Sequence, residues 1–187
     1  DLVVPGDYDG DGKTDFAVFR PSTGVWYLQR STAGFGAVQF GQAGDKPVAG
    51  DFDGDGKTDY AVYRPSNGVW YLLQSTAGFA ALQFGLSTDL VVPGDYDGDG
   101  KTDVAVFRPS TGVWYFQRST AGFGAAQFGT TGDLPSPGDY DGDGKTDVAV
   151  FRPGAQSVFY IQGTTTGFNA VPWGIAEDRP IPNAFVR

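Results

Sequence analysis

The 187-residue chain contains no cysteine and no histidine. The absence of cysteine excludes disulfides and thiolate chemistry, and the absence of histidine removes the commonest general base and nitrogen ligand for metals. Basic residues are also scarce: 13 Lys and Arg stand against 22 Asp and Glu, and the net charge of −9 argues against a nucleic-acid partner. No run of residues is long and apolar enough to insert into a membrane. With so few groups for catalysis, we expect that the chain is not an enzyme.

What the sequence has in abundance is internal repetition. The string DYDGDGKTD at Asp7 returns as DFDGDGKTD at Asp51 and as DYDGDGKTD at Asp95 and Asp139, with a constant spacing of 44 residues. A fixed period of this length marks a repeat architecture, in which short copies stack into one body. We therefore predict a single repeat domain over residues 1–187, with copies at 1–44, 45–88, 89–132 and 133–177 and a partial copy at 178–187.

Each copy predicts four β-strands. In the first copy they are Leu2–Tyr8, interrupted by Pro5, then Asp15–Arg20, Val25–Arg30 and Ala37–Gly41. These runs are rich in Val, Phe, Tyr and Trp and are bounded by Gly, Pro, Ser and Thr. The second strand is apolar at successive residues, which predicts a sheet covered on both faces. The expected fold class is all-β: a β-propeller-like array of four four-stranded blades plus one extra C-terminal strand.

The repeated acidic loop lies between the first and second predicted strands of each copy. Counted from Asp7, aspartates stand at positions one, three, five and nine, with glycine at six and lysine at seven. This is the register of the front half of an EF-hand loop, in which positions one, three and five supply side-chain oxygens and position seven a backbone carbonyl. Val18 stands where the EF-hand has its bidentate Glu, so we expect Asp15 to bind the cation directly.

Aspartate and glycine also favour turns, but turn formation accounts for one or two aspartates and not for four in this register. Crowded carboxylates repel one another unless a cation neutralises them. The four loops hold 16 of the 22 acidic residues, and four divalent cations would change the net charge from −9 to −1. All-oxygen ligands favour Ca²⁺ over Zn²⁺, and Mg²⁺ prefers a strict octahedron with retained waters. We predict one Ca²⁺ per repeat, with each lysine contributing its backbone carbonyl. The predicted ligands are Asp7, Asp9, Asp11, Lys13 and Asp15; Asp51, Asp53, Asp55, Lys57 and Asp59; Asp95, Asp97, Asp99, Lys101 and Asp103; and Asp139, Asp141, Asp143, Lys145 and Asp147.

The acidic loop DxDGDGxxD, together with the Phe-Gly pairs that close the fourth strand at Phe40, Phe84 and Phe128, resembles the FG-GAP / VCBS repeats. Those repeats are the calcium-binding blades of integrin-α-like β-propellers and are common in bacterial secreted and surface proteins. The resemblance covers nearly the whole chain. It implies calcium ligands at the loop aspartates and an extracellular or cell-surface location in a bacterium. The repeats here are shorter and fewer than integrin blades.

Two further residue types recur. Each arginine that ends a second strand could bind a ligand carboxylate or sulfate, but we favour an ion pair with the aspartate that begins the next copy. The tryptophans could stack on sugar rings, but we favour a place in the core between blades. The arginines are Arg20, Arg64, Arg108 and Arg152, their expected partners are Asp45, Asp89, Asp133 and Asp178, and the tryptophans are Trp26, Trp70 and Trp114.

The partial copy DRPIPNAFVR has lost the acidic loop, because Ala184 replaces the first loop aspartate. We expect Ile181, Ala184, Phe185 and Val186 to form an assembly strand, which caps a sheet edge or joins a neighbouring molecule. The sequence thus predicts a calcium-stabilised extracellular repeat domain with a structural or adhesive scaffold role. Its expected partner is itself, or a surface protein or glycan. The alternative is a β-propeller lectin that holds sugars between its blades.

Overall fold

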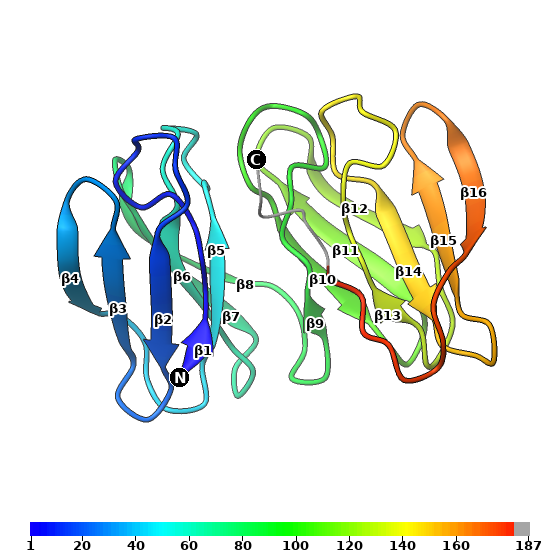
Figure 1. Cartoon of the computed structure of the whole chain (residues 1–187), viewed down its shortest axis with the longest axis horizontal. Coiled ribbons are helices and arrows are strands. Elements are labelled where there is room, and N and C mark those ends of the chain that lie inside the picture. Colours follow the sequence, from blue (N-terminus) through cyan, green and yellow to red (C-terminus); the bar gives the residue numbers. More distant parts are fainter. Residues whose placement is uncertain (182–187) are drawn as a thin grey trace. The chain divides into compact units, whose positions relative to one another are not determined.

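In the computed structural model, which describes residues 1–181, the chain consists of sixteen β-strands joined by turns and loops (Figure 1). The first two repeats form β1 (Leu2–Val3), β2 (Phe16–Arg20), β3 (Val25–Arg30), β4 (Gly34–Gln39), β5 (Lys46–Gly50), β6 (Asp59–Arg64), β7 (Val69–Gln74) and β8 (Gly78–Gln83). The last two form β9 (Leu90–Val91), β10 (Val104–Arg108), β11 (Val113–Arg118), β12 (Gly122–Gln127), β13 (Leu134–Pro135), β14 (Val148–Arg152), β15 (Val158–Gly163) and β16 (Gly167–Pro172). Within the described residues, no helix is long and apolar enough to cross a membrane.

Each repeat forms one antiparallel four-stranded sheet, which we call a blade: blade 1 is β1–β4, blade 2 is β5–β8, blade 3 is β9–β12 and blade 4 is β13–β16. The prediction of an all-β chain with four four-stranded blades is therefore confirmed. The extra C-terminal strand is not seen in the described part of the partial copy, where Ile181 lies outside any strand and is 92% exposed. The other predicted assembly-strand residues, Ala184, Phe185 and Val186, lie outside the described residues.

The chain divides into two compact units, Asp1–Ser87 and Thr88–Arg187. Unit 1 contains blades 1 and 2, and unit 2 contains blades 3 and 4. The division coincides with the predicted boundary between the second and third copies to within one residue. Each unit is therefore a pair of repeats, while the single domain over residues 1–187 stays a prediction.

Three of the four strands of the first repeat have bounds that differ from those predicted: β2 begins one residue later, at Phe16, β4 ends two residues earlier, at Gln39, and two further boundaries differ more. The first strand is only two residues long, because Pro5 cannot donate to a ladder, and the pairing continues only as an isolated bridge between Gly6 and Asp15. The fourth strand begins at Gly34, three residues earlier than predicted. The positive φ of 70° at Gly34 closes the preceding turn, so that Phe35 already pairs with β3.

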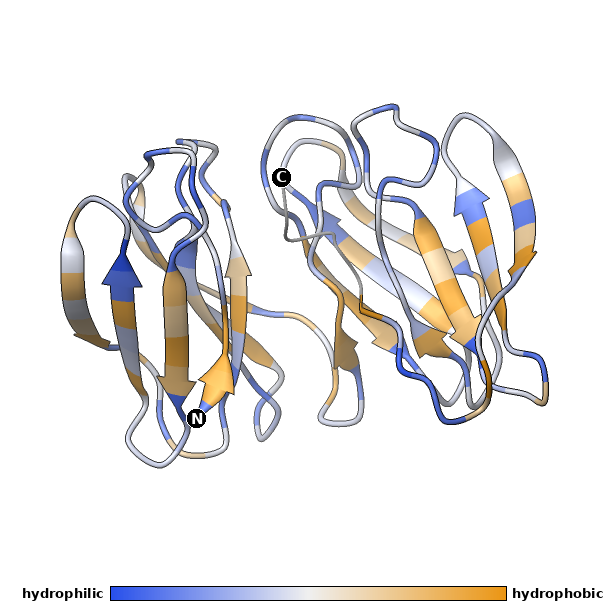
Figure 2. Cartoon of the chain, viewed as in Figure 1, coloured by the Kyte–Doolittle hydropathy of each residue, from blue (hydrophilic) through white to orange (hydrophobic). Residues whose placement is uncertain are grey.

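The core of each unit lies between its two blades. In unit 1, the face of blade 1 that carries Phe19, Trp26 and Leu28 packs against Tyr60 and Val62 of blade 2. In unit 2, the corresponding residues of blade 3, Phe107, Trp114 and Phe116, pack against Val148, Val150 and Tyr160 of blade 4. Apolar residues are concentrated in the strands, and the loops are mainly hydrophilic (Figure 2). This packing holds the two acidic loops of a unit at the same end of their blades (Figure 1).

The three tryptophans belong to the core, as predicted: Trp26, Trp70 and Trp114 are all 0% exposed. Each indole N–H donates to a backbone carbonyl at the end of its own blade, for example Trp26 Nε1 to Phe40 O at 2.8 Å. A buried ring whose only polar atom is satisfied in this way has no surface left to stack on a sugar. Trp26 and Trp114 therefore hold the two blades of their unit together, and none of the three buried rings forms a ligand site.

The arginines form ion pairs, but the predicted partner is wrong. Arg64 binds Asp45, the first residue of its own repeat, at 2.8 Å, and not an aspartate of the next repeat. The antiparallel pairing of the first and second strands explains the choice, because it places the start of a repeat beside the end of its second strand. Each guanidinium also lies over a tyrosine ring of the third strand at 4.2–4.5 Å from its centroid. The other pairs are Arg20 with Asp1, Arg108 with Asp89 and Arg152 with Asp133.

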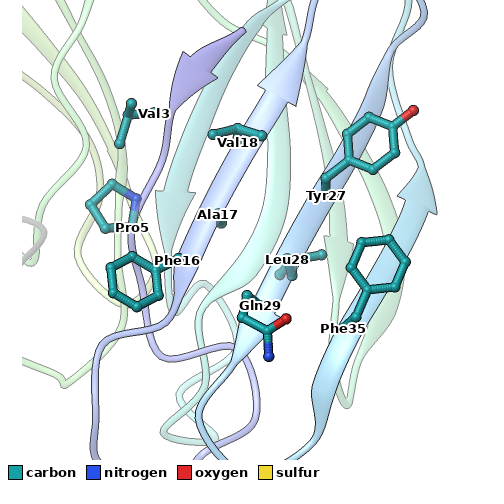
Figure 3. Close-up of a pocket in the computed structure, with 9 residues that line it drawn as sticks. All are labelled: Val3, Pro5, Phe16, Ala17, Val18, Tyr27, Leu28, Gln29 and Phe35. Atoms are coloured by element: carbon teal, nitrogen blue, oxygen red, sulfur yellow. The ribbon is translucent and has the colours of Figure 1, made fainter.

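The prediction that every blade is covered on both faces is wrong for blade 1. Its outward face exposes Phe16 at 81% and Val3 at 79%, although the residue of blade 2 that corresponds to Phe16, Tyr60, packs against Trp26. Figure 3 shows Phe16, Val18, Tyr27 and Phe35 around a shallow apolar hollow on this face. The strand sequence is the same type in every repeat, so it cannot reveal that Phe16 is exposed whereas Tyr60 is packed.

Candidate metal centre

The acidic loop of blade 1 is wound around its first aspartate. The carboxylate of Asp7 accepts hydrogen bonds from the backbone N–H groups of Gly10 at 2.7 Å, Gly12 at 2.8 Å and Asp11 at 3.2 Å. Gly10 and Gly12 have φ angles of 78° and 82°, a left-handed backbone that glycine adopts without strain. The alternation of aspartate and glycine therefore curls the backbone so that successive carboxylates face one region. The first aspartates of the other loops accept the equivalent Gly54, Gly98 and Gly142 bonds.

The last aspartate of the loop ties it to the blade. Asp15 is 2% exposed, and its two oxygens accept hydrogen bonds from the N–H groups of Tyr8 at 2.9 Å and Ser31 at 2.7 Å. The first bond closes the loop, and the second joins it to the turn between β3 and β4. Equivalent pairs of bonds hold Asp59, Asp103 and Asp147.

The aspartate at the third position of the loop carries the clearest sign of a cation site. Asp9 Oδ2 accepts hydrogen bonds from the N–H groups of Thr32 and Ala33 at 3.0 and 2.8 Å. Asp9 Oδ1 is buried and has no hydrogen-bond partner among the described residues. A buried carboxylate oxygen without a partner is costly, and buried charges are normally paired or bound to metal. The same atom is unpartnered in all four loops, in Asp9, Asp53, Asp97 and Asp141.

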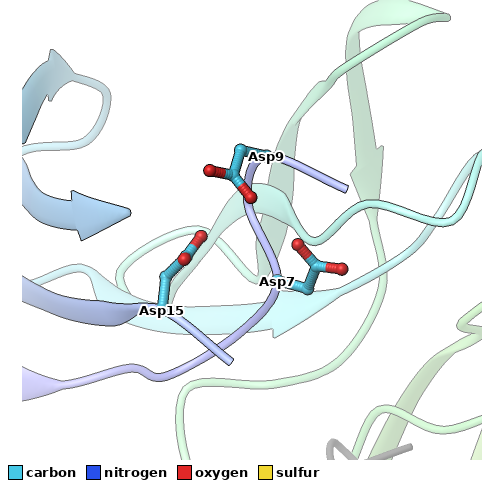
Figure 4. A group of neighbouring side chains, drawn as sticks. All are labelled: Asp7, Asp9 and Asp15. Carbon is cyan, nitrogen blue, oxygen red and sulfur yellow. The ribbon is translucent and has the colours of Figure 1, made fainter. Parts of the chain in front are cut away.

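Asp9 lies close to two other carboxylates of its loop. One oxygen each from Asp7, Asp9 and Asp15 lie within 4.8 Å of one another, and Figure 4 shows the three side chains converging. Such a group of hard oxygen donors fits Ca²⁺, whose oxygen ligands stand about 2.3–2.6 Å from the ion. The residues present therefore fit a divalent cation. The other groups are Asp51, Asp53 and Asp59; Asp95, Asp97 and Asp99; and Asp139, Asp141 and Asp147.

The fifth position is placed differently from the others. In blade 1, Asp11 is not in the group of three, and its Oδ2 accepts hydrogen bonds from the hydroxyls of Ser31 and Thr32 at 2.5 Å. These hydroxyls, followed by the backbone and ammonium groups of Lys13, hold the pKa of Asp11 well below its usual range. Asp55 and Asp143 lie likewise outside their groups, whereas Asp99 belongs to its group in blade 3. Direct ligation by the fifth position stays a prediction.

The lysines at position seven do not all extend into solvent. Lys13 is 72% exposed and its ammonium lies 3.2 Å from Asp11. The stems of Lys57 and Lys145, by contrast, lie over glycines of the preceding loop of the same unit. The predicted role of the four lysine carbonyls as ligands, at Lys13, Lys57, Lys101 and Lys145, stays a prediction.

Burial opposes the negative charge of the last aspartates. Burial raises the pKa of Asp59 to about 6, and the nearby carboxylates of Asp53 and Asp51 add to the effect, although N–H bonds from Ser75 and Phe52 oppose it. The pKa of Asp103 is raised to about 6 for the same reasons, and that of Asp147 is also raised. Carboxylates that lie this close together in a partly buried region repel one another, and a bound cation would offset the repulsion.

The sequence did not predict a second segment that binds the carboxylates of the acidic loop. The turn Ser31–Ala33 supplies three N–H groups and two hydroxyls to Asp15, Asp9 and Asp11. It stands 16–24 residues after the aspartates that it binds, so only the pairing of β2, β3 and β4 brings it close. The one available signal was recurrence, since each acidic loop is followed at this distance by a Ser-Thr or Thr-Thr pair.

The chain matches two models of one repeat family. The model described as FG-GAP-like repeat matches residues 7–62, 51–106 and 95–150, and the model described as FG-GAP repeat matches residues 131–171. The first three matches each begin at the first aspartate of an acidic loop. A search of curated proteins gave no match.

Two solved structures are similar to this chain. One is described as BBS1N in complex with ARL6DN, soaked with mercury; its TM-score is 0.55 at 10% identity, over 92% of this chain and 53% of that one. The other is the biofilm matrix protein Bap1 of V. cholerae, with a TM-score of 0.45 at 17% identity, over 93% of this chain and 29% of that one. This chain spans about half the length of the first protein and under a third of the second. At 10% identity, the likeness to the first shows the fold alone. Because the family models together match residues 7–171, the chain belongs to the family of FG-GAP-like repeats.

Proposed function

We propose that this protein is a calcium-stabilised extracellular repeat domain that serves as a structural or adhesive scaffold. The observation that carries the calcium component is the unpartnered buried oxygen at the same position of all four loops. The first and third aspartates of each loop would hold the ion, together with the last aspartate in blades 1, 2 and 4 and Asp99 in blade 3, and the bound ion would neutralise their charge. A cation site present in every repeat maintains the fold and does not mark one ligand site. The proposed role is therefore not enzymatic.

An extracellular location agrees with this kind of calcium site. The loops lack the bidentate Glu of EF-hand position twelve, and sites with fewer charged ligands bind more weakly. Weak sites of this kind fill at the millimolar calcium concentrations found outside cells. In this proposal the ion stabilises the blades permanently and does not act as a switch.

The outward face of blade 1 supports self-association as the basis of the scaffold. Val3, Phe16 and Phe35 are 71–81% exposed, whereas Tyr60, the blade 2 counterpart of Phe16, packs against the core of unit 1. A contiguous apolar patch of this kind marks an interaction surface. We propose that a second copy of the chain covers it, and that the C-terminal assembly strand, Ile181 to Val186, takes part in the contact.

Self-association is tested by sedimentation velocity over a range of protein concentrations in calcium. We expect the wild-type chain to form larger species as the concentration rises and Phe16→Glu to remain monomeric, because the variant places a charge in the apolar contact. Deletion of residues 178–187 is expected to weaken association as well. The matched control is Phe79→Glu, at another exposed phenylalanine (64%, against 81% for Phe16) on β8 of blade 2. A monomeric wild type, or Phe16→Glu that associates as the wild type does, would contradict the proposal.

One observation favours the second candidate function, glycan binding. Each blade exposes a phenylalanine at the start of its fourth strand, and an exposed ring can stack on a sugar. These residues are Phe35 (71%), Phe79 (64%), Phe123 (65%) and Phe168 (63%). A glycan array in calcium separates the two functions, because a lectin binds a defined sugar set and a scaffold binds none.

A further inference from the structure

The two acidic loops of each unit are in direct contact. In unit 1 they are loop 1 (residues 7–15) and loop 2 (residues 51–59). In unit 1, the N–H of Thr58 donates to the carbonyl of Asp7 at 2.6 Å. In unit 2, the N–H of Thr146 donates to the carbonyl of Asp95 at the same distance. Each threonine is position eight of its own loop and immediately precedes the buried aspartate of position nine. One hydrogen bond therefore joins the last ligand of one loop to the first ligand of the preceding loop.

Side chains pack around this hydrogen bond. A Cβ added at Gly6 would lie 2.6 Å from Oγ1 and Cγ2 of Thr58, and one added at Gly10 would lie 2.8 Å from the stem of Lys57. The backbone at Gly6 has no positive φ, so contact with Thr58, and not backbone conformation, requires glycine there. Unit 2 repeats both contacts: a Cβ at Gly94 would lie 2.7 Å from Thr146 Oγ1, and one at Gly98 would lie 2.9 Å from the stem of Lys145.

The residue that Thr58 contacts, Asp7, organises the hydrogen bonds of its own loop. Asp7 accepts three of the hydrogen bonds that wind loop 1, and one of its oxygens belongs to the candidate metal group. Fixing the peptide of Asp7 therefore fixes the part of loop 1 from which the first ligand extends. The threonine at position eight of loop 1, Thr14, is exposed, whereas Thr146, which contacts a preceding loop, is buried.

From these contacts we infer that Thr58 and Thr146 are positioning residues for the neighbouring loop, so that each unit binds its two cations as a coupled pair. The inference rests on the proposed function, because it needs calcium in the loops. A cation in loop 2 draws Asp51, Asp53 and Asp59 around one point and orders the segment that carries Thr58. The ordered segment holds Asp7 in place, so the second cation meets a loop that has already lost its freedom. By linkage, a cation in loop 1 favours loop 2 by the same factor.

Charge acts in the opposite direction. A cation bound in one loop makes the neighbouring loop less attractive to a second cation, because it reduces the shared negative potential. Salt screens this effect over roughly 8 Å at physiological ionic strength, whereas a hydrogen bond and van der Waals contacts are not screened. We therefore expect net positive coupling, with an affinity gain of about five-fold or more at 0.15 M salt.

The test is calcium binding by isothermal titration calorimetry in the full chain. A background of Asp97→Ala and Asp141→Ala, which removes the side-chain oxygens at position three, confines binding to unit 1, and adding Asp53→Ala or Asp9→Ala leaves one site at a time. The coupling factor is the affinity of the second binding step in the pair, divided by the affinity expected from the isolated sites. Gly6→Ala, which forces Thr58 away, is expected to reduce this factor to near one. Thr58→Gly keeps the backbone N–H but removes the side-chain contacts with Gly6, and is expected to reduce the factor by less. Thr14→Gly is the matched control and is expected to leave the factor unchanged.

The outcomes separate this inference from the function on which it rests. Two calcium ions that bind independently, or with negative coupling, overturn the coupled pair and leave calcium binding intact. Positive coupling that survives both Gly6→Ala and Thr58→Gly overturns the role of Thr58. No calcium binding by the background protein overturns the proposed function itself.

Discussion

Removal of calcium is expected to lower the melting temperature of the protein by about 10–20 °C. An ion present at about ten times its dissociation constant, as millimolar calcium is for a weak extracellular site, stabilises the folded state by about 1.4 kcal/mol. Each unit holds two candidate sites, and in a domain of this size each kcal/mol shifts the melting temperature by roughly 4–8 °C. The carboxylates left without a cation also repel one another, which adds to the loss.

The measurement is thermal unfolding followed by circular dichroism, in millimolar calcium and in excess EGTA. The control adds magnesium to the EGTA-treated protein. We expect magnesium to restore little of the stability, because it demands an octahedron at shorter distances than a flexible calcium loop provides. A melting temperature that is the same with and without EGTA would refute the stabilising role of calcium.

Asp59→Ala is expected to destabilise the protein in calcium by about 3–6 kcal/mol, because it removes two separate contributions. Asp59 is 0% exposed and accepts hydrogen bonds from the N–H groups of Phe52 at 2.8 Å and Ser75 at 2.7 Å. Alanine leaves the buried N–H of Phe52 and the part-buried N–H of Ser75 without this acceptor, at about 1–3 kcal/mol each. It also removes a ligand of the loop 2 cation.

The two contributions separate when the same variant is measured in EGTA, where only the hydrogen-bond loss remains. The matched control is Asp55→Ala, at the exposed fifth position of the same loop. The partners of Asp55 are the hydroxyls of Ser75 and Thr76, which water can satisfy once the carboxylate is gone. We expect Asp55→Ala to cost less than about 1 kcal/mol in EGTA. Equal effects of the two substitutions in EGTA would show that Asp59 does not tie the loop to its blade.

The local features of the fold could be read from the sequence, and the long-range ones could not. The loop Asp7–Asp15 and the strand Val25–Arg30 have the predicted bounds, because turn residues and β-branched or aromatic runs act over a few positions. The partner of Arg64 was predicted in the wrong repeat, because the aspartate that begins each repeat occurs both before and after the arginine in the sequence. Only the antiparallel pairing of β5 with β6 decides between them.

The candidate metal centre shows the same division. The first, third and last aspartates were predicted from their register and lie together in blade 1, at Asp7, Asp9 and Asp15. The turn Ser31–Ala33, which holds these carboxylates from the other side, was not predicted, because its contacts depend on how two later strands pair. The contact between Thr58 and Asp7 was likewise out of reach, since it depends on how one blade packs on the next.

The central claim is that every repeat holds one calcium ion through its acidic loop, and a direct count of bound calcium tests it. The protein is dialysed to equilibrium in millimolar calcium at 0.15 M salt, and the calcium bound per chain is measured by atomic emission. The account predicts four ions per chain, and three when Asp53→Ala removes the carboxylate whose buried oxygen has no hydrogen-bond partner. A wild-type chain that binds no calcium, or a count that Asp53→Ala leaves unchanged, would contradict it.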